Sequence, residues 1–164
     1  AQGNFAETGR VLLEILEKRK SDFLGESGRS QYQNLKSKIH TLRNWLQLTQ
    51  LKLTIGSFKT EHSRSFLNYL VNEKHLSLQT RNKYKSELTT IWKFLIHDGI
   101  VSDNPFKNVP WLKPKNTPFR KHPEEVQKAI IENMPKEDMQ LYIACMLVFE
   151  CFIRVTELNR LQLY

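Results

Sequence analysis

Apolar residues recur at helical spacing along most of the chain, and the alternation typical of strands is confined to one short stretch. The clearest apolar stripe runs from Tyr32 to Leu46 in steps of three and four residues. It predicts a core-facing helix over about residues 30–48. Ser30 is followed three residues later by Gln33, a spacing that resembles a capping box, so this helix is predicted to begin there.

A short amphipathic helix is predicted before it, over about residues 8–23, and Gly25 and Gly28 then interrupt the pattern. Two roles fit this helix: it is a lid on the following module, or an arm that packs on a neighbour. After the long stripe, three closely spaced apolar residues predict another helix over about residues 60–72.

The longest helix is expected to begin after Ser77, a suitable N-cap, and its apolar stripe runs from Tyr84 to Leu95. Gly99 suits the left-handed position that ends a helix. Asn104 and the proline after it then form a turn that opens one more helical turn at most. About four helices with short connections predict an all-α fold class, a small helical bundle.

Prolines and basic residues alternate in the next stretch, which predicts an extended linker over residues 113–122. A further helix is predicted from Pro123 to about Pro135, followed by an apolar helix over residues 138–151 that we expect to be fully buried. The predicted domains are an N-terminal helix or arm (1–26), the helical bundle (27–112), the linker (113–122) and a C-terminal fragment (123–164).

Charge is unevenly distributed along the chain, whose net charge is +8. Residues 1–115 contain 19 basic and 10 acidic residues, a net of +9, whereas residues 116–164 contain 6 and 7, a net of −1. Residues 27–60 contain six basic residues and no acidic one. A basic half beside a neutral half predicts one module that faces a polyanion, although an ordinary soluble basic surface has the same composition.

Other kinds of site and location are disfavoured by the sequence. No stretch reaches the roughly 18 apolar residues that a membrane span needs, and no secretory-signal pattern opens the sequence. The five histidines make no metal-ligand spacing, so we expect no metal and no cofactor. Cys145 and Cys151 lie in an apolar run, and we expect them to be buried, reduced thiols of a cytoplasmic protein.

The most specific motif follows the apolar helix: Phe152, Ile153 and Arg154, then Glu157 and Leu158. From the residues alone, Arg154 and Glu157 form an ordinary ion pair three residues apart on a helix. The pattern Phe-Ile-Arg-x-x-Glu-Leu-x-x-Leu also resembles the first active-site box of the tyrosine recombinases, the phage-integrase family. In that family the arginine grips the scissile DNA phosphate.

Three further stretches resemble the same family in the same order. Ser77, Thr80 and Tyr84 resemble the start of a helix in its core-binding, SAM-like domain. Residues 99–106 resemble the Gly-Ile and Asn-Pro exit from that helix, and residues 120–126 resemble the beginning of the catalytic domain. Together with the arginine motif, these stretches occur in the order that the family has.

The resemblance covers about residues 27–164, with Phe152 where the family often has glycine and His122 where it usually has threonine. The sequence ends at Tyr164, ten residues after Arg154. The family's Lys, His-x-x-Arg pair and nucleophilic Tyr have no room there. The chain therefore resembles a core-binding domain plus the first part of a catalytic domain, truncated after the first Arg box. We expect this chain to be inactive by itself.

For the full-length parent, the resemblance implies a site-specific recombinase or integrase of a mobile element. Such an enzyme cuts and rejoins DNA through a 3′-phosphotyrosyl intermediate. Arg154 would clamp the phosphate, Glu157 would hold the arginine or its helix, and no metal or ATP would be needed. The implied partners are duplex DNA and other recombinase protomers, with no membrane and no small-molecule substrate. The implied location is the bacterial cytoplasm, at the nucleoid.

The basic bundle is expected to form one half of a C-shaped clamp around duplex DNA. Three candidate contacts lie off the apolar stripe in the acid-free stretch, and four lie near the helix N-terminus after Ser77, where backbone N–H groups favour phosphate. The candidate DNA contacts are Lys36, Lys38, Arg43, Thr80, Arg81, Lys83 and Lys85. Two other functions stay open: a stand-alone helical DNA-binding accessory module, and a helical protein-interaction module whose basic face meets an acidic partner.

Overall fold

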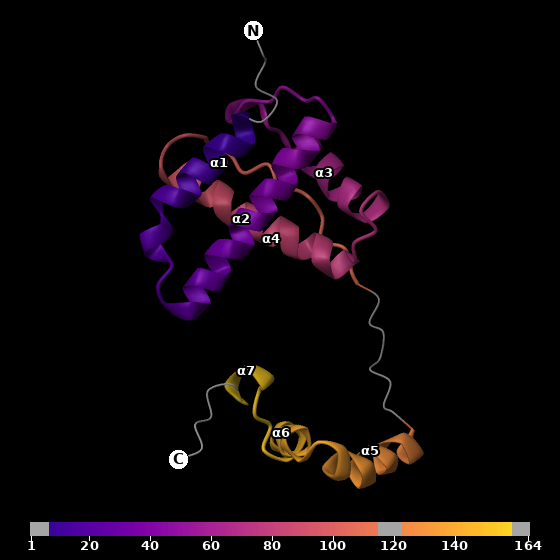
Figure 1. The fold of residues 1–164 in the computed structure, drawn as a ribbon. Coiled ribbons are helices and arrows are strands. Elements are labelled where there is room, and N and C mark those ends of the chain that lie inside the picture. The colour runs from indigo at the N-terminus through magenta and orange to yellow at the C-terminus, as the bar shows by residue number, and fades with distance from the viewer. Residues whose placement is uncertain (1–6, 115–122, 159–164) are drawn as a thin grey trace. The chain divides into compact units, whose positions relative to one another are not determined.

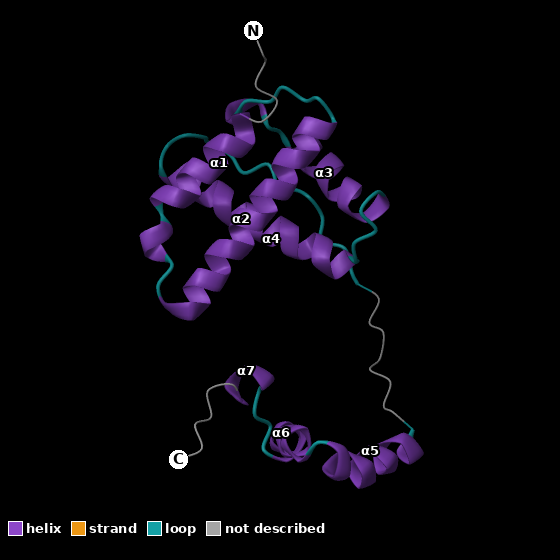
Figure 2. Ribbon diagram, viewed as in Figure 1, coloured by secondary structure: helices purple, strands orange, loops and turns teal. Residues whose placement is uncertain are grey.

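The computed structural model describes residues 7–114 and 123–158, and within these ranges all regular structure is helical (Figures 1 and 2). The predicted all-α class is therefore confirmed. The chain divides into two compact units, residues 1–115 and residues 116–164. None of the helices in the described ranges is both long and apolar enough to cross a membrane.

The first unit is a bundle in which α2 packs against α1 and α4, while α3 packs against α4. Figure 1 shows α2 crossing α4 near the middle of the bundle. The elements are α1 (Glu7–Lys18), η1 (Lys20–Asp22), α2 (Gly25–Leu48), η2 (Ile55–Ser57), α3 (Thr60–Asn72) and α4 (Leu78–His97).

Helix α1 is an integral part of this bundle. Leu12, Ile15 and Leu16 are buried in the same core as the apolar residues of α2, α3 and α4. Thr8 is buried as well, and its hydroxyl donates a hydrogen bond of 2.5 Å to the carbonyl of Leu53. The helix therefore packs against α2 and α4 of its own unit, as expected for a lid on the following module.

The start of α2 differs from the prediction. The helix begins at Gly25, five residues before Ser30, and Gly25 has the positive φ of +67° that glycine tolerates. Gly28 lies inside the helix, where an added Cβ would come within 2.6 Å of the carbonyl carbon of Phe23. Glycine is thus present because the preceding backbone passes close to the helix. As a result α2, with 24 residues, and not α4, with 20, is the longest helix described.

The bounds of α3 and the two ends of α4 were predicted correctly. The hydroxyl of Ser77 accepts a hydrogen bond of 3.1 Å from the backbone N–H of Thr80, so it caps α4. At the other end Gly99 has a φ of +69°, and the N–H of Ile100 donates to the carbonyl of Leu95 at 2.9 Å. These are the features of a glycine-terminated helix.

The turn after α4 closes the core. The side-chain amide of Asn104 donates to the carbonyl of Thr89 at 2.9 Å, and its oxygen accepts from the N–H of Phe106 at 3.0 Å. Phe106 is fully buried, with its ring centroid 5.1 Å from that of Trp92 and 6.0 Å from that of Phe58. A buried polar residue that satisfies both halves of its amide fixes the path of this turn.

The second unit contains α5 (Glu124–Glu137), α6 (Met139–Glu150) and α7 (Val155–Leu158). Pro135 was predicted to end α5 but lies inside it, in the last turn, where a missing N–H removes a single intrahelical bond. The N–H of Asp138 bonds the carbonyl of Met134 at 2.8 Å and closes the helix. The side chain of Asp138 then caps α6 by accepting from the N–H of Leu141.

The apolar pattern of α6 predicts a fully buried helix, but α6 is only partly covered within this unit. Leu141 and Ile143 are 50% and 51% exposed, and Phe149 is 74% exposed. Cys145 and Cys151, expected to be buried, are exposed free thiols. The reason is that α5 packs against one side of α6 and leaves the rest of its apolar circumference uncovered within the unit.

Candidate nucleic-acid interface

The three candidate contacts on α2 do not lie on one face. The Nζ of Lys38 is 4.6 Å from the ring centroid of Tyr84 and 3.8 Å from the Oε2 of Glu87, both on α4. The side chains of Lys38 and Glu87 are only 15% and 16% exposed. This lysine therefore joins two helices as half of a largely covered ion pair.

Lys36 and Arg43 lie one heptad apart on the side of α2 that faces α1. The Nζ of Lys36 is 6.0 Å from the ring centroid of Tyr32, whose hydroxyl hydrogen-bonds Glu17 of α1. Arg43 packs across Gly9, where an added Cβ would come within 2.7 Å of the Cβ of the arginine. Although residues 27–60 contain no acidic residue, carboxylates of α1 and α4 therefore lie close to them in the fold.

The N-terminus of α4 has its cap satisfied within the helix. Ser77 Oγ accepts from Thr80 N–H and lies 2.9 Å from Thr80 Oγ1. Thr80 is half-buried, and Lys83, one turn further on, is exposed. Of the four candidates on α4, Lys83 is the one that is exposed.

Arg81 is buried rather than exposed, which differs from its expected place at the surface. Its side chain is 2% exposed, and its Nη1 donates to the carbonyl of Pro110 at 2.8 Å and to the side-chain oxygen of Asn82 at 3.0 Å. Its Nε has no hydrogen-bond partner in the described part of the chain. Burial lowers the pKa of Arg81, since desolvation disfavours the charged form.

Lys85 lies one turn after Arg81 on α4 and is also buried, with 4% exposed. Its Nζ is 4.0 Å from the ring centroid of Trp111, a cation–π contact. Burial, and then the charge of Arg81, lower the pKa of Lys85. Neither cation has an acidic partner among the described residues, and Glu87, the one acidic residue of α4, pairs with Lys38.

A surface hollow of about 560 Å³ opens beside Lys85, and we call it the α4 groove. Three of its lining residues are lysines, and none is acidic. Hydroxyl groups lie between the lysines along α4, and an indole forms one wall. The groove is lined by Lys85, Ser86, Thr89, Thr90, Lys93, Ile96, Asn104, Lys107 and Trp111.

Sequence reasoning missed most of this groove. Lys85, Thr89 and Lys93 recur every four residues, so a basic stripe on α4 was visible in the sequence. Lys107 and Trp111 come from the segment after α4, and only the folded turn at Asn104 brings them to the helix. A periodicity argument along one helix could not include them.

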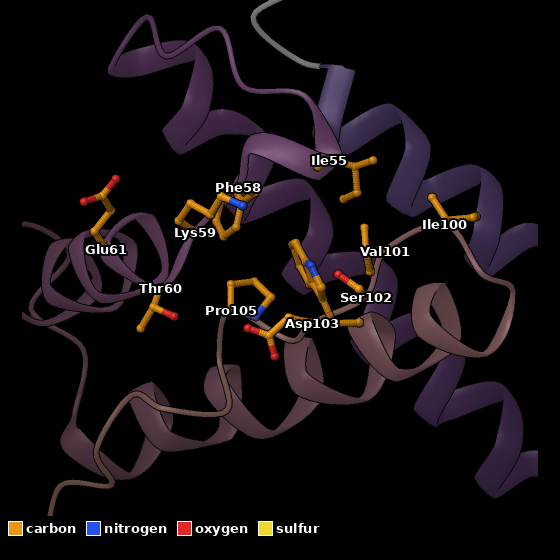
Figure 3. A pocket seen from close by; sticks show the side chains of 12 residues that line it. Ile55, Phe58, Lys59, Thr60, Glu61, Ile100, Val101, Ser102, Asp103 and Pro105 are labelled. Atoms are coloured by element: carbon orange, nitrogen blue, oxygen red, sulfur yellow. The ribbon is translucent and has the colours of Figure 1, made fainter.

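A second hollow, of about 550 Å³, lies between the start of α3 and the turn after α4 (Figure 3). Trp92 and Phe58 contribute aromatic side chains to it. Glu61 and Asp103 also line it, together with Lys59 as its one basic residue. Two carboxylates and one ammonium make this hollow a poorer match for a polyanion than the α4 groove.

In the second unit, Glu157 holds the backbone at Arg154. Its Oε2 accepts a hydrogen bond of 3.0 Å from the N–H of Arg154, which is the glutamate half of a capping box at α7. The side chain of Arg154 is exposed. Arg154 and Glu157 both lie in the described part of the chain, and no ion pair joins their side chains there. Leu161 and Tyr164 lie outside the described residues.

The described residues contain no group of three His, Cys, Asp or Glu side chains arranged to hold a metal ion. Comparison with known proteins found no match among curated proteins and none among solved structures. Residues 11–115 match the family model of the phage integrase SAM-like domain, from within α1 to the end of the first unit. Since this match spans more than half of the sequence, the chain belongs to the family of phage integrase SAM-like domains.

Proposed function

We propose that the first unit binds duplex DNA through the α4 groove, as the core-binding part of a tyrosine recombinase. The observation that carries the proposal is the groove itself, with three lysines and no acidic residue, in a phage integrase SAM-like domain. DNA phosphates supply the negative charge that such a groove lacks, and binding releases the counterions around them.

The proposal revises the set of contacting residues. In the groove, Lys85 remains a candidate, and Lys93 and Lys107 join it. Thr80 and Lys83 remain candidates near the N-terminus of α4, outside the residues that line the groove. The other four candidates from the sequence make contacts within the bundle. Lys38 forms an ion pair with Glu87, and Arg81 donates a hydrogen bond to the carbonyl of Pro110. Lys36 and Arg43 face α1. Phosphate contacts of this kind give affinity and register but read no bases directly.

For the second unit we propose that Arg154 is a phosphate clamp of the parent recombinase. A guanidinium donates two parallel hydrogen bonds to a phosphate and stays charged at physiological pH. Glu157 supports it by fixing the backbone at Arg154. Cleavage would need a tyrosine nucleophile and further clamps that the family resemblance does not place in this chain.

A salt titration on a random-sequence duplex tests the DNA-binding proposal. We expect affinity to fall steeply with salt, with a slope of about −0.9 for each phosphate contacted. The double variant Lys93→Glu/Lys107→Glu should weaken binding about tenfold or more and flatten that slope by roughly two contacts. A helical protein-interaction module with an acidic partner would instead show no binding to duplex DNA at all.

The matched control is Arg64→Glu/Lys74→Glu, which changes the net charge equally at two exposed residues outside the groove. It should lose much less affinity than the groove variant, since long-range charge alone is screened at physiological salt. Equal losses in the two double variants would mean that the groove is not the interface.

A further inference from the structure

The first residues of the chain to leave the bundle are bound to α4, and we call residues 110–112 the exit segment. The amide of Asn82 donates to the carbonyl of Leu112 at 2.6 Å, and its oxygen accepts from the N–H of Leu112 at 3.2 Å. Arg81 donates to the carbonyl of Pro110 at 2.8 Å. Two neighbouring residues of α4 thus hold both ends of the exit segment.

The middle of the exit segment forms a wall of the α4 groove. Trp111 lines the groove, and the Nζ of Lys85 lies 4.0 Å from its ring centroid. Trp111 is 59% exposed, whereas Lys85 is 4% exposed. The groove in its present form therefore requires the exit segment to be docked on α4.

Buried positive charge without a counter-charge occurs at Lys85, which lines the groove, and at Arg81, one turn before it on α4 and outside the lining. Arg81 and Lys85 are buried on successive turns of one helix, and no carboxylate among the described residues compensates either of them. The Nε of Arg81 has no hydrogen-bond partner there. Buried cations are costly unless an anion meets them, so this arrangement fits a site whose counter-charge comes from a ligand.

We propose that the α4 groove is a phosphate site whose occupancy and the docking of the exit segment stabilise each other. A backbone phosphate of duplex DNA, accepting from the ammonium groups of Lys85, Lys93 and Lys107, is the ligand. The bound phosphate fixes Lys85 and Trp111, and through them the direction in which the chain leaves the bundle. This inference rests on the proposed DNA binding and adds a consequence to it: DNA contact stabilises the docked exit segment.

Coupling of this kind is reciprocal. If bound phosphate favours the docked exit segment, then loosening the exit segment must weaken phosphate binding by the same factor. Asn82 is therefore a positioning residue: it is bonded to Leu112 and does not line the groove. Its replacement changes DNA affinity only if docking and binding are coupled.

Tryptophan fluorescence of the whole chain tests the proposal. Trp45 and Trp92 are buried, at 3% and 1% exposed, so quenching by acrylamide reports mainly on Trp111. A random-sequence duplex should reduce this quenching, and the Trp111→Phe variant should lose the change. Asn82→Ala should raise the quenching of the free protein and weaken duplex binding about fivefold, within the usual range of coupling between sites.

Lys85→Met keeps the length and apolar stem of the side chain and removes its charge. It should weaken duplex binding while leaving the unfolding midpoint equal or higher, since it removes an unpaired buried cation. Inorganic phosphate at constant ionic strength is the second ligand. It should protect Trp111 only at concentrations far above those of duplex, and stronger protection by phosphate than by duplex would overturn DNA as the source.

The outcomes separate this inference from the proposed function. Salt-dependent duplex binding with Trp111 quenching unchanged, or with full affinity in Asn82→Ala, would refute the coupling and leave DNA binding intact. If no duplex binding is found at low salt, both the coupling and the proposed DNA binding are refuted. Protection of Trp111 by duplex, lost in Lys85→Met and reduced in Asn82→Ala, would support the coupled site.

Discussion

Asn82 and Leu112, thirty residues apart, are joined by two hydrogen bonds, in which the side-chain amide of one pairs with both backbone groups of the other. The same Asn82 oxygen accepts from Nη1 of Arg81. These contacts tie the end of the first unit to α4.

We predict that Asn82→Asp destabilises the first unit by about 1–3 kcal/mol, because a carboxylate would face the carbonyl of Leu112 where an amide now donates. Urea unfolding followed by circular dichroism measures this change. Asn68→Ala, at an exposed position of α3, is the control and should lie within about 0.5 kcal/mol of the wild type. Equal midpoints for the two variants would show that the Asn82–Leu112 pair contributes nothing.

The cap of α4 gives a second prediction. Ser77→Ala removes the acceptor of the Thr80 N–H and should cost about 1 kcal/mol. Ser30→Ala should be neutral or slightly stabilising, since Ser30 lies inside α2 and alanine has the higher helix propensity. Thermal unfolding of both variants checks this, and a larger loss at Ser30 would restore the helix start that the sequence predicted.

These two serines show which parts of the fold were accessible from the sequence. The cap at Ser77 and the end at Gly99 depend on residues within one helical turn, so local patterns were sufficient. The start of α2 depends on the backbone of Phe23 passing over Gly28, a packing relation that no local pattern encodes. The glycine was therefore interpreted as a break in the helix.

The candidate site was less accessible for the same reason. Basic residues could be counted in the sequence, but their neighbours could not: Lys38 meets Glu87 across a helix pair, and Arg81 is covered by Pro110, twenty-nine residues away. In the folded chain, the stretch without acidic residues lies close to two carboxylates of other helices, Glu87 of α4 and Glu17 of α1. The basic stripe of α4 was visible only in part, because its other wall comes from another segment.

Gly28 gives a third prediction. Gly28→Ala would place a Cβ within 2.6 Å of the Phe23 carbonyl carbon, and backbone cannot shift as easily as a flexible side chain. We expect a loss of about 1–3 kcal/mol, typical of overpacking, although alanine is the better helix former. Gly56→Ala is the control, since an added Cβ there meets no atom within 4 Å. Chemical unfolding should rank Gly28→Ala clearly below Gly56→Ala.

The last prediction concerns pH. The hydrogen bond to Glu17 is the largest cause that raises the pKa of Tyr32 from 10.0 to about 12, and the same bond is the largest cause that lowers the pKa of Glu17 from its ordinary 4.5. The Tyr32 contribution is thus fully present below pH 10 and is lost as pH rises through about 12. The Glu17 contribution is present above pH 4.5 and is lost as pH falls through its lowered pKa. The stability difference between wild type and Tyr32→Phe should therefore be largest between these limits and shrink beyond both, as urea unfolding across pH would show.

Two variants of α1 serve as controls for this prediction. Glu17→Gln should remove the loss of this stability difference at acid pH, whereas Glu14→Gln, on the same helix, should not. A stability difference that is independent of pH would refute the pairing of Tyr32 with Glu17.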